Sequence, residues 1–471
     1  MYPFTQQEKT RRIASWLDGT PEGPSKMEIE VTDLCQLKCR FCWMRDSERA
    51  KHVDPARELT AERWLEIVRE AASLGVLEWR ICGGGEPLMR YDTTIPMCTL
   101  IKELGMFGHL TTNGQRFDDD DIRRFVEVGW DLVEFSLEGP TAEINDPLRG
   151  KGSWEKVMRC IRLFKTYKER LGKDKPKITI STVLTRYNYF GLPDFMTLAA
   201  ETGIAKIAVN PITIMGDYDG REKSTTHLKL IEELAEDVPR TLTRAKEIAD
   251  RGGVETNVEQ FLEIDLIGKT NTMDEVIRED VEKFRAGCTE SSRAGEAARP
   301  DTAKIEDFRD RMVIDRISAS ELAADRPYTE VDGSGLEGDK PCAARAGQPA
   351  EGGVEGRIEG LYDQYNAPCY APWYCIAIRP YGKVGACVLF DETELDLHRM
   401  SLEEVWTSPM FEQMRADLKT NRIPWYCRRC SPNNVHNERE IRERLHRYQL
   451  EREEEAKRSP LDRVRSLIPG R

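Results

Sequence analysis

Short apolar runs alternate with longer amphipathic stretches along the first half of the chain. The runs are rich in β-branched and aromatic residues, which is typical of buried strands. They cover residues 27–32, 77–82, 108–112, 131–137, 177–184 and 206–211. The pattern therefore predicts six strands.

Between these strands, apolar residues recur with a helical period. The stretches that show it are 60–75, about 96–105, 119–129, 153–172 and 192–203. Several begin at Thr, Ser or Asp and end at Gly, the residues that cap helices. Strands that alternate with helices predict an α/β fold with a parallel sheet, either open or curled into a partial barrel.

After about residue 215 this alternation stops. We expect a long helix over 226–251, interrupted at Pro239, and another over 274–286. Residues 288–360 are dominated by Gly, Ala, Arg, Asp and Glu, which predicts a loosely packed insertion or linker.

Cysteines and aromatic residues return from Pro368 onward. Residues 437–459 are so heavily charged that they predict a solvated terminal helix. The chain is thus expected to contain an N-terminal extension, a main α/β domain, a helical and partly disordered insertion, a small cysteine-rich domain and a charged C-terminal helix. These segments are 1–25, 26–215, 216–365, 366–436 and 437–471.

Composition limits the possible functions. The chain has 471 residues, with 70 Lys and Arg against 83 Asp and Glu, a net charge of −13 that repels nucleic acid. It has neither a signal peptide nor an apolar run of the roughly 20 residues that span a bilayer, so we expect a cytoplasmic protein without a membrane partner. In that reducing compartment, 13 cysteines point to metal binding or catalysis rather than disulfides.

Three of these cysteines, Cys35, Cys39 and Cys42, directly follow the first predicted strand. Active sites of α/β folds lie at the carboxyl ends of strands. Three thiolates occupy three corners of a tetrahedral site, or three irons of a four-iron cluster, and leave one position open. A structural zinc loop with a distant fourth ligand is the alternative.

A run of glycines follows the second predicted strand, in the sequence Ile-Cys-Gly-Gly-Gly-Glu-Pro-Leu at 81–88. Successive glycines let the backbone approach a ligand closely, and Glu86 offers an acceptor for an ammonium group. The alternative is a tight turn between strand and helix. Its place beside the cysteine loop favours a shared site.

Together these motifs resemble those of the radical S-adenosylmethionine (SAM) enzymes, which carry Cys-x3-Cys-x2-Cys after the first strand and Gly-Gly-Glu-Pro after the second. The resemblance covers about residues 26–215 and implies a partial (β/α)6 TIM-like barrel. It implies that Cys35, Cys39 and Cys42 hold a 4Fe–4S cluster whose fourth iron binds the amino and carboxylate groups of SAM. One-electron cleavage of SAM then gives a 5′-deoxyadenosyl radical that abstracts hydrogen from a substrate.

Further positions match the family in order along the chain. The resemblance implies that SAM is bound by Gly84, Gly85, Glu86, Pro87, Asn113 and Ser136. Arg149 follows in a loop expected to face the barrel mouth, where it could clamp an anionic substrate or make a structural salt bridge.

Four cysteines near the C-terminus form a hairpin pair and a Cys-x2-Cys motif. They are Cys369, Cys387, Cys427 and Cys430. By spacing alone this set suits zinc as well as iron–sulfur. The pattern Cys-x12-Gly-x4-Cys followed by Cys-x2-Cys resembles the SPASM/twitch domain that follows many radical SAM barrels, which implies one auxiliary cluster, expected to be 4Fe–4S.

The fuller SPASM pattern continues with further cysteines, but His436 and Glu440 stand at two of those positions. The single-cluster twitch form therefore fits better. Cys375 is expected to be a spare buried thiol near the cluster. The remaining cysteines are expected to be core or surface residues: Cys82, Cys98, Cys160, Cys288 and Cys342.

The sequence constrains the substrate less than it constrains the cofactors. Only about 26 residues precede the first strand, too few for the leader-recognition domain of many peptide maturases, so we expect a small molecule, such as a sugar or aminocyclitol. The expected reaction is a dehydrogenation, deoxygenation or epimerisation, with the auxiliary cluster as electron acceptor or conduit. The enzyme is expected to be an oxidoreductase with a one-electron donor such as flavodoxin or ferredoxin, and a redox-neutral reaction is the alternative. A radical SAM maturase of a peptide or protein and a zinc-stabilised binding protein without catalytic activity are the alternatives.

Overall fold

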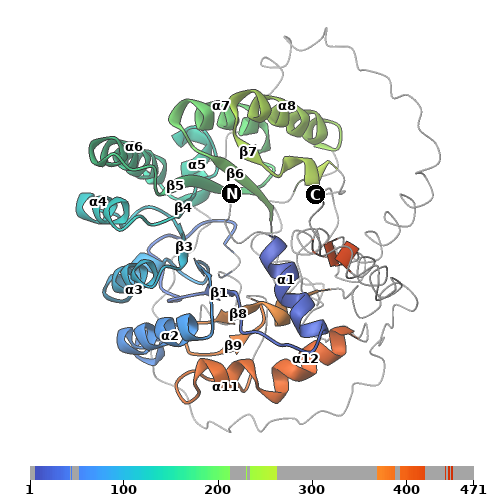
Figure 1. Cartoon of the computed structure of the whole chain (residues 1–471). Coiled ribbons are helices and arrows are strands. Elements are labelled where there is room, and N and C mark those ends of the chain that lie inside the picture. Colours follow the sequence, from blue (N-terminus) through green and yellow to red (C-terminus); the bar gives the residue numbers. More distant parts are fainter. Residues whose placement is uncertain are drawn as a thin grey trace, which may run out of the picture. The chain divides into compact units, whose positions relative to one another are not determined.

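All six predicted strands are present in the computed structural model, and they lie side by side in one parallel sheet (Figure 1). They are β1 (Lys26–Ile29), β2 (Glu78–Ile81), β3 (Phe107–Thr112), β4 (Leu132–Ser136), β5 (Lys177–Leu184) and β6 (Lys206–Pro211). The structure describes residues 6–42, 44, 52–212, 230, 234–262, 369–387, 393–419, 441, 444–445 and 447–448. The α/β fold with a partial barrel is confirmed.

The five predicted helices are also present, as crossovers between successive strands. They are α2 (Ala61–Ser73), α3 (Tyr91–Glu103), α4 (Asp119–Glu127), α6 (Ser153–Leu171) and α7 (Leu192–Thr202). The Thr60 hydroxyl accepts from the N–H of Arg63 at the start of α2, and Gly203 ends α7 in the left-handed conformation. Both caps agree with the residue types that the sequence predicts at helix ends.

The start of α3 differs from the prediction. It begins at Tyr91, before Pro96, which lies inside the helix. A proline there removes only one hydrogen bond of the helix. Thr94, which is fully buried, donates to the carbonyl oxygen of Pro87 at 2.6 Å and so ties the first turn of α3 to the preceding η4 turn.

The described residues contain further helical elements besides these five helices, in addition to α8 and the terminal helix described below. The α-helices are α1 (Gln6–Leu17), α5 (Ala142–Arg149), α11 (Leu402–Trp406) and α12 (Pro409–Lys419). The 3-10 turns are η3 (Pro55–Arg57), η4 (Pro87–Arg90), η5 (Tyr189–Gly191), η9 (Val258–Phe261) and η10 (Ala371–Trp373).

The helix expected over 226–251 is shorter. It is α8 (Asp237–Gly252), with Pro239 in its first turn, where a proline is tolerated, and Leu230 is not helical. After α8 comes the short strand β7 (Glu255–Thr256), which pairs with β6. The helix expected at 274–286 and the linker expected at 288–360 lie outside the described residues.

The cysteine-rich segment extends the main sheet, which the sequence analysis did not foresee. Strand β8 (Cys375–Ile378) pairs in parallel with β1, placing Cys375 opposite Lys26, and β9 (Val384–Gly385) returns antiparallel to β8. The sheet order is β7-β6-β5-β4-β3-β2-β1-β8-β9. The chain divides into two compact units, and all described residues belong to the unit formed by residues 1–281 and 356–471.

The hairpin between β8 and β9 explains a glycine in the cysteine pattern. Gly382 has φ of 75°, and a Cβ there would lie 2.9 Å from the His398 ring. Its N–H donates to the carbonyl oxygen of Arg379 at 3.0 Å, closing the turn. Only glycine meets both requirements easily.

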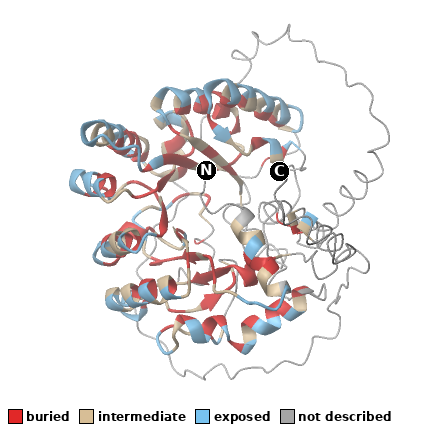
Figure 2. Cartoon of the chain, viewed as in Figure 1, coloured by how far each residue is buried: buried red, intermediate tan, exposed pale blue. Residues whose placement is uncertain are grey.

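The two faces of the sheet differ in chemistry. Met27, Trp79 and Val133 are fully buried in one hydrophobic core. Figure 2 shows that the strands are mostly buried and that the helices beside the sheet are exposed on their outer sides. The opposite face carries charge: Arg80 contacts Glu28 at 2.9 Å and Glu134 at 3.7 Å. Burial opposes ionisation of Glu28, but Lys26 and Arg80 lower its pKa to about 2, so the carboxylate stays charged near neutral pH.

The expected solvated helix at 437–459 is half correct. Its described residues are helical, yet Ile441 and Leu445 are fully buried and pack in one cluster with Ile13, Tyr370 and Trp373. The spacing of four residues places both apolar side chains on one helix face. Charged residues dominate the segment, so its sequence does not reveal that these two apolar side chains are buried. No helix in the described part of the chain is apolar over the length that a bilayer requires.

This packing makes a prediction. Leu445→Ala should destabilise the protein by about 2 to 4 kcal/mol, because it removes a buried side chain and leaves a cavity. Arg447→Ala, at an exposed position of the same helix, should change stability by no more than about 0.5 kcal/mol. Urea unfolding followed by circular dichroism measures both. Equal effects would show that this helix face is not packed.

Candidate functional site

The chain that leaves β1 is fixed before it reaches the cysteines. Glu58, whose side chain is fully buried, accepts hydrogen bonds from the Thr32 hydroxyl at 2.8 Å and the N–H of Asp33 at 3.1 Å. Arg90 donates to its other oxygen at 2.8 Å. A buried carboxylate is stable only with such partners, so the start of the loop has little freedom.

The three cysteines differ in exposure. Cys39 is 8% exposed and packs with Phe41 and Leu148, whereas Cys35 is exposed and Cys42 is half-buried. The N–H of Cys42 donates to the carbonyl oxygen of Cys39 at 3.2 Å, which makes a tight turn. The loop is therefore anchored at Cys39 and open at Cys35.

The glycine run contacts the segment that leads into this loop through backbone hydrogen bonds. The N–H of Gly85 donates to the carbonyl oxygen of Thr32, and that of Glu86 donates to the carbonyl oxygen of Leu34, both at 2.7 Å. A Cβ on Gly85 would lie 1.9 Å from the Leu34 oxygen, so no other residue fits. Gly84 has φ of 63°, which also favours glycine. These contacts bring the two sequence motifs together.

The carboxylate of Glu86 is hydrogen-bonded to other groups of the fold. It is 2% exposed, and its carboxylate accepts from the Thr112 hydroxyl at 2.7 Å, the N–H of Asn113 at 2.7 Å and the N–H of Leu88 at 3.2 Å. Burial raises the pKa of Glu86, although these three hydrogen bonds favour the charged form. Glu86 thus ties the loop after β2 to the loop after β3.

Asn113 links this network to the cysteines. Its side-chain amide donates to Sγ of Cys35 over 3.7 Å, and its Oδ1 accepts from Gln36 at 3.0 Å. Gln36 is a contact that the sequence analysis missed, because nothing local to it signals a partner 77 residues away. Pro87 is buried at the start of η4, and Ser136 lies half-buried at the end of β4.

Arg149 is paired within the fold. Its guanidinium contacts Glu138 at 2.7 Å, Nη1 donates to Sγ of Cys39 over 3.7 Å, and its charge lies over the Phe41 ring at 5.2 Å. Burial opposes the charge on Arg149, but Glu138 raises the Arg149 pKa overall. The structural salt bridge, which was the alternative, is what the structure contains. A clamp on substrate would require that pair to open.

Two of the four C-terminal cysteines are described. Cys369 precedes η10, where the N–H of Ala371 donates to its Sγ at 3.4 Å, and Cys387 follows β9. Cys427 and Cys430 lie outside the described residues. Cys375, on β8, is 3% exposed, as expected of a buried thiol.

The other cysteines within the described part behave as expected. Cys82, Cys98 and Cys160 are buried, and burial raises the pKa of each. Cys288 and Cys342 fall outside the described part.

The three-cysteine loop and the described C-terminal cysteine Cys369 lie at opposite ends of β1. The three-cysteine loop follows its carboxyl end, whereas the parallel pairing with β8 places the turn after Cys369 at its amino end. There the N–H groups of Ser25 and Lys26 both donate to the carbonyl oxygen of Tyr374 at 2.9 Å. A strand of four residues spans about 13 Å, which sets the scale of the separation.

The donor set fits a polynuclear iron–sulfur cluster. Cys35, Cys39 and Cys42 supply thiolates only, and N–H donors from Asn113 and Arg149 point at two of the sulfurs. Among the described residues, no three His, Cys, Asp or Glu side chains are arranged around a single metal ion. In a four-iron cluster, each thiolate instead binds a different iron.

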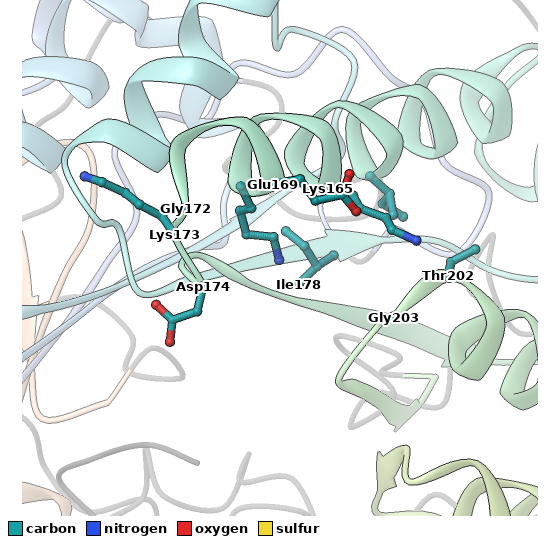
Figure 3. Close-up of a pocket in the computed structure, with 10 residues that line it drawn as sticks. Lys165, Glu169, Gly172, Lys173, Asp174, Ile178, Thr202 and Gly203 are labelled. Atoms are coloured by element: carbon teal, nitrogen blue, oxygen red, sulfur yellow. The ribbon is translucent and has the colours of Figure 1, made fainter.

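A cavity of about 540 Å³ lies elsewhere on the main domain (Figure 3). Its lining includes Lys168, Lys173 and Gly203, from the segments that lead into β5 and β6. It is therefore at the amino ends of these strands. The motifs of the candidate site follow the carboxyl ends of β1 to β4, so the cavity is not part of that site.

Two family models match the chain. The model of the radical SAM superfamily covers residues 29–199, and that of SPASM, an iron–sulfur cluster-binding domain, covers residues 369–431. The second match begins at Cys369 and includes the other three C-terminal cysteines that the sequence analysis selected.

Similar curated proteins cover a limited part of the chain. A PqqA peptide cyclase from Ruegeria pomeroyi is 30% identical over 42% of this chain and 50% of its own length. A mycofactocin maturase from Mycolicibacterium smegmatis is 29% identical over 42% and 48%, respectively. A tungsten-containing aldehyde ferredoxin oxidoreductase cofactor-modifying protein from Pyrococcus furiosus is 28% identical over 39% and 50%. The chain thus spans about half the length of these relatives.

Solved structures show a more distant likeness. Streptococcus suis SuiB bound to S-adenosylmethionine has a TM-score of 0.45 at 18% identity, over 86% of this chain and 69% of that chain. Native anSMEcpe with bound AdoMet has a TM-score of 0.45 at 14% identity, over 88% of this chain and 88% of that chain. Likeness at this level says nothing about activity.

The docking of the glycine run makes a prediction. Gly85→Ala should cost about 3 kcal/mol of folding free energy, because its Cβ would overlap the Leu34 carbonyl and push the two loops apart. Gly129→Ala should cost only about 1 kcal/mol, since it adds left-handed strain in open space. Thermal unfolding of both variants compares them. An equal loss would mean that the loops do not depend on this contact.

Proposed function

We propose that the chain is a radical SAM enzyme with a C-terminal SPASM domain and that it modifies a peptide substrate. A radical SAM domain requires SAM and a 4Fe–4S cluster, and a SPASM domain binds auxiliary iron–sulfur clusters, as expected from the sequence. The observation that carries the proposal of a radical SAM site is the docking of the glycine run onto the three-cysteine loop, through Gly85 and Glu86. The peptide substrate is supported by the similarity to PqqA peptide cyclases.

In this proposal Cys35, Cys39 and Cys42 hold the cluster, and the open side at Cys35 faces the ligand. SAM would bind to the backbone of Gly84 and Gly85, to Glu86 and Pro87, and to Asn113 and Ser136. When bound, SAM and its cluster supply a 5′-deoxyadenosyl radical that abstracts a hydrogen atom from an unactivated carbon. The protein supplies orientation and excludes water and oxygen.

The residues of the chain prepare this site. Glu86 fixes two loops by accepting three hydrogen bonds, so the backbone groups around it are set before a ligand arrives. Arg149 and Glu138 form a buried ion pair against Cys39, which closes that side of the loop to solvent. In this proposal Arg149 supports the cysteine loop and is not assigned to the substrate.

Cys369, Cys387, Cys427 and Cys430 would hold one auxiliary cluster, of the 4Fe–4S type. Cys369 and Cys387 would keep it at the amino end of β1, where it could take up one electron, and the overall reaction is then an oxidation. A one-electron donor such as flavodoxin or ferredoxin is part of the proposal, as is a cytoplasmic location.

The choice of a peptide corrects the expectation of a sugar or aminocyclitol. It is supported by the similarity to PqqA peptide cyclases of several organisms. A small molecule remains the second candidate, because one relative of similar identity is named for modifying the cofactor of an oxidoreductase.

Replacement of one cysteine tests the class of reaction. Anaerobically purified protein with both clusters should contain about eight irons and release 5′-deoxyadenosine from SAM under reductant. Cys39→Ala should lower that release at least about 100-fold. Cys98→Ala, which changes a buried core cysteine of α3, should leave it within about twofold. Release by Cys39→Ala at the wild-type rate would contradict the proposal.

The peptide is tested by stimulation. Short peptides encoded beside the gene and candidate sugars are each added to the reduced enzyme with SAM, and 5′-deoxyadenosine and substrate mass are measured. The proposal expects a peptide to raise release and to change in mass. Stimulation by sugars alone would refute it in favour of the small-molecule candidate.

A further inference from the structure

Arg415, on α12, is a buried cation without a carboxylate partner among the ion pairs of the described residues. It is 4% exposed. Its guanidinium carbon lies 4.1 Å from the centre of the Trp16 ring, 4.4 Å from that of Trp406 and 5.5 Å from that of Phe411. Three aromatic faces therefore supply the stabilisation that a carboxylate usually gives.

The hydrogen bonds of Arg415 lead directly to the auxiliary site. Its Nε donates to the carbonyl oxygen of Pro372 at 2.9 Å, and its Nη2 donates to that of Trp406 at 3.2 Å. Pro372 is the middle residue of η10, the turn that joins Cys369 to β8. Arg415 thus holds the third residue after Cys369.

The N-terminal segment closes the other side of this cage. Trp16, on α1, supplies the ring nearest to the cation. The indole N–H groups of Trp16 and Trp406 both donate to the carbonyl oxygen of Glu22, at 3.0 and 3.2 Å. Residues far apart in the sequence, from the first 25 and the last 100, therefore build one structure around the guanidinium.

Burial lowers the pKa of Arg415 to about 10, so the side chain stays charged at neutral pH. A charged group this deep is costly to bury, and simple core packing would be served as well by a Leu or Met. The guanidinium differs from those side chains by its two directed bonds, one of which fixes the turn of a candidate cluster ligand. The buried guanidinium of Arg415 therefore does more than fill space in the core.

We propose that Arg415 is a positioning residue for the auxiliary cluster: caged by Trp16, Trp406 and Phe411, it holds the η10 turn so that Cys369 is presented to iron. This inference rests on the proposed function, since it requires a cluster at Cys369. It goes further by giving the N-terminal helix and α12 a defined part in that site.

The test compares Arg415→Met with Arg63→Met. Arg63, on α2, also donates two hydrogen bonds to backbone carbonyl oxygens of the C-terminal region, those of Leu397 at 2.8 Å and Met400 at 2.9 Å. Neither acceptor belongs to the turn that follows Cys369. Iron per chain, the rate of iron loss to a chelator, the EPR spectrum of the reduced clusters and 5′-deoxyadenosine release without substrate are measured on anaerobic full-length protein.

Wild-type protein should hold about eight irons and Arg415→Met about four, with the EPR signal of the auxiliary cluster lost and that of the SAM cluster kept. Release of 5′-deoxyadenosine should stay within about twofold of wild type. Arg63→Met should keep about eight irons. Arg415→Lys, which keeps a cation and one donor, should lose auxiliary iron at least about tenfold more slowly than Arg415→Met.

Wild-type and Arg415→Met proteins with the same iron content and the same rate of loss would overturn the inference while the proposed function stands. Equal loss in Arg63→Met would also overturn it, because any loosening of the region would then suffice. Wild-type protein without auxiliary iron would reject the proposed function and this inference together. If Arg415→Met does not fold, Trp16→Leu decides: faster loss of auxiliary iron than wild type supports the cage, and an unchanged rate overturns it.

Discussion

The pairing of β1 on both of its edges is the constraint on which the rest of this structure depends. Parallel strands bond evenly along their length, so β1 fixes β2 on one side and β8 on the other within the same four residues. The loop with Cys35, Cys39 and Cys42 extends from the carboxyl end of β1, and the turn with Cys369 lies at its amino end. The three-cysteine loop and the turn after Cys369 are therefore both positioned by a single strand.

Buried carboxylates recur as the means by which loops at the site are fixed. Glu58, Glu86 and Glu138 follow this pattern after β1, β2 and β4, and each accepts hydrogen bonds from a hydroxyl and from the backbone of a neighbouring segment. Arginines complete the pattern at Glu58 and Glu138. Such groups are costly to bury, and losing one partner leaves a charge unsatisfied, so the arrangement favours one conformation of each loop. Loops fixed in this way bind a ligand with less loss of entropy than mobile ones.

Much of the sheet could be predicted because its signals are local. Apolar runs at 27–32 and 177–184 and glycine or threonine caps mark the strands and helices around the site. The cysteine and glycine motifs could be placed at strand ends for the same reason. The pairing of β8 with β1 could not, since the four residues Cys-Ile-Ala-Ile carry no mark of a partner about 350 residues earlier. The burial of Ile441 and Leu445 could not be predicted either, and the two expected roles of Arg149 could not be told apart, because these roles depend on contacts with distant segments that charge and spacing do not reveal.

Hydrogen–deuterium exchange of the native protein, read at the amides of β1, β2 and β8, tests the shared sheet most directly. Amides of β8 that bond to β1 should be as protected as those between β1 and β2, and the three strands should open with one free energy, because they form a single cooperative unit. This should hold both before and after removal of iron from the C-terminal cysteines. Rapid exchange of β8 beside a protected β1 and β2 would contradict the account, since the cysteine-rich segment would then be a separate domain that merely touches the barrel.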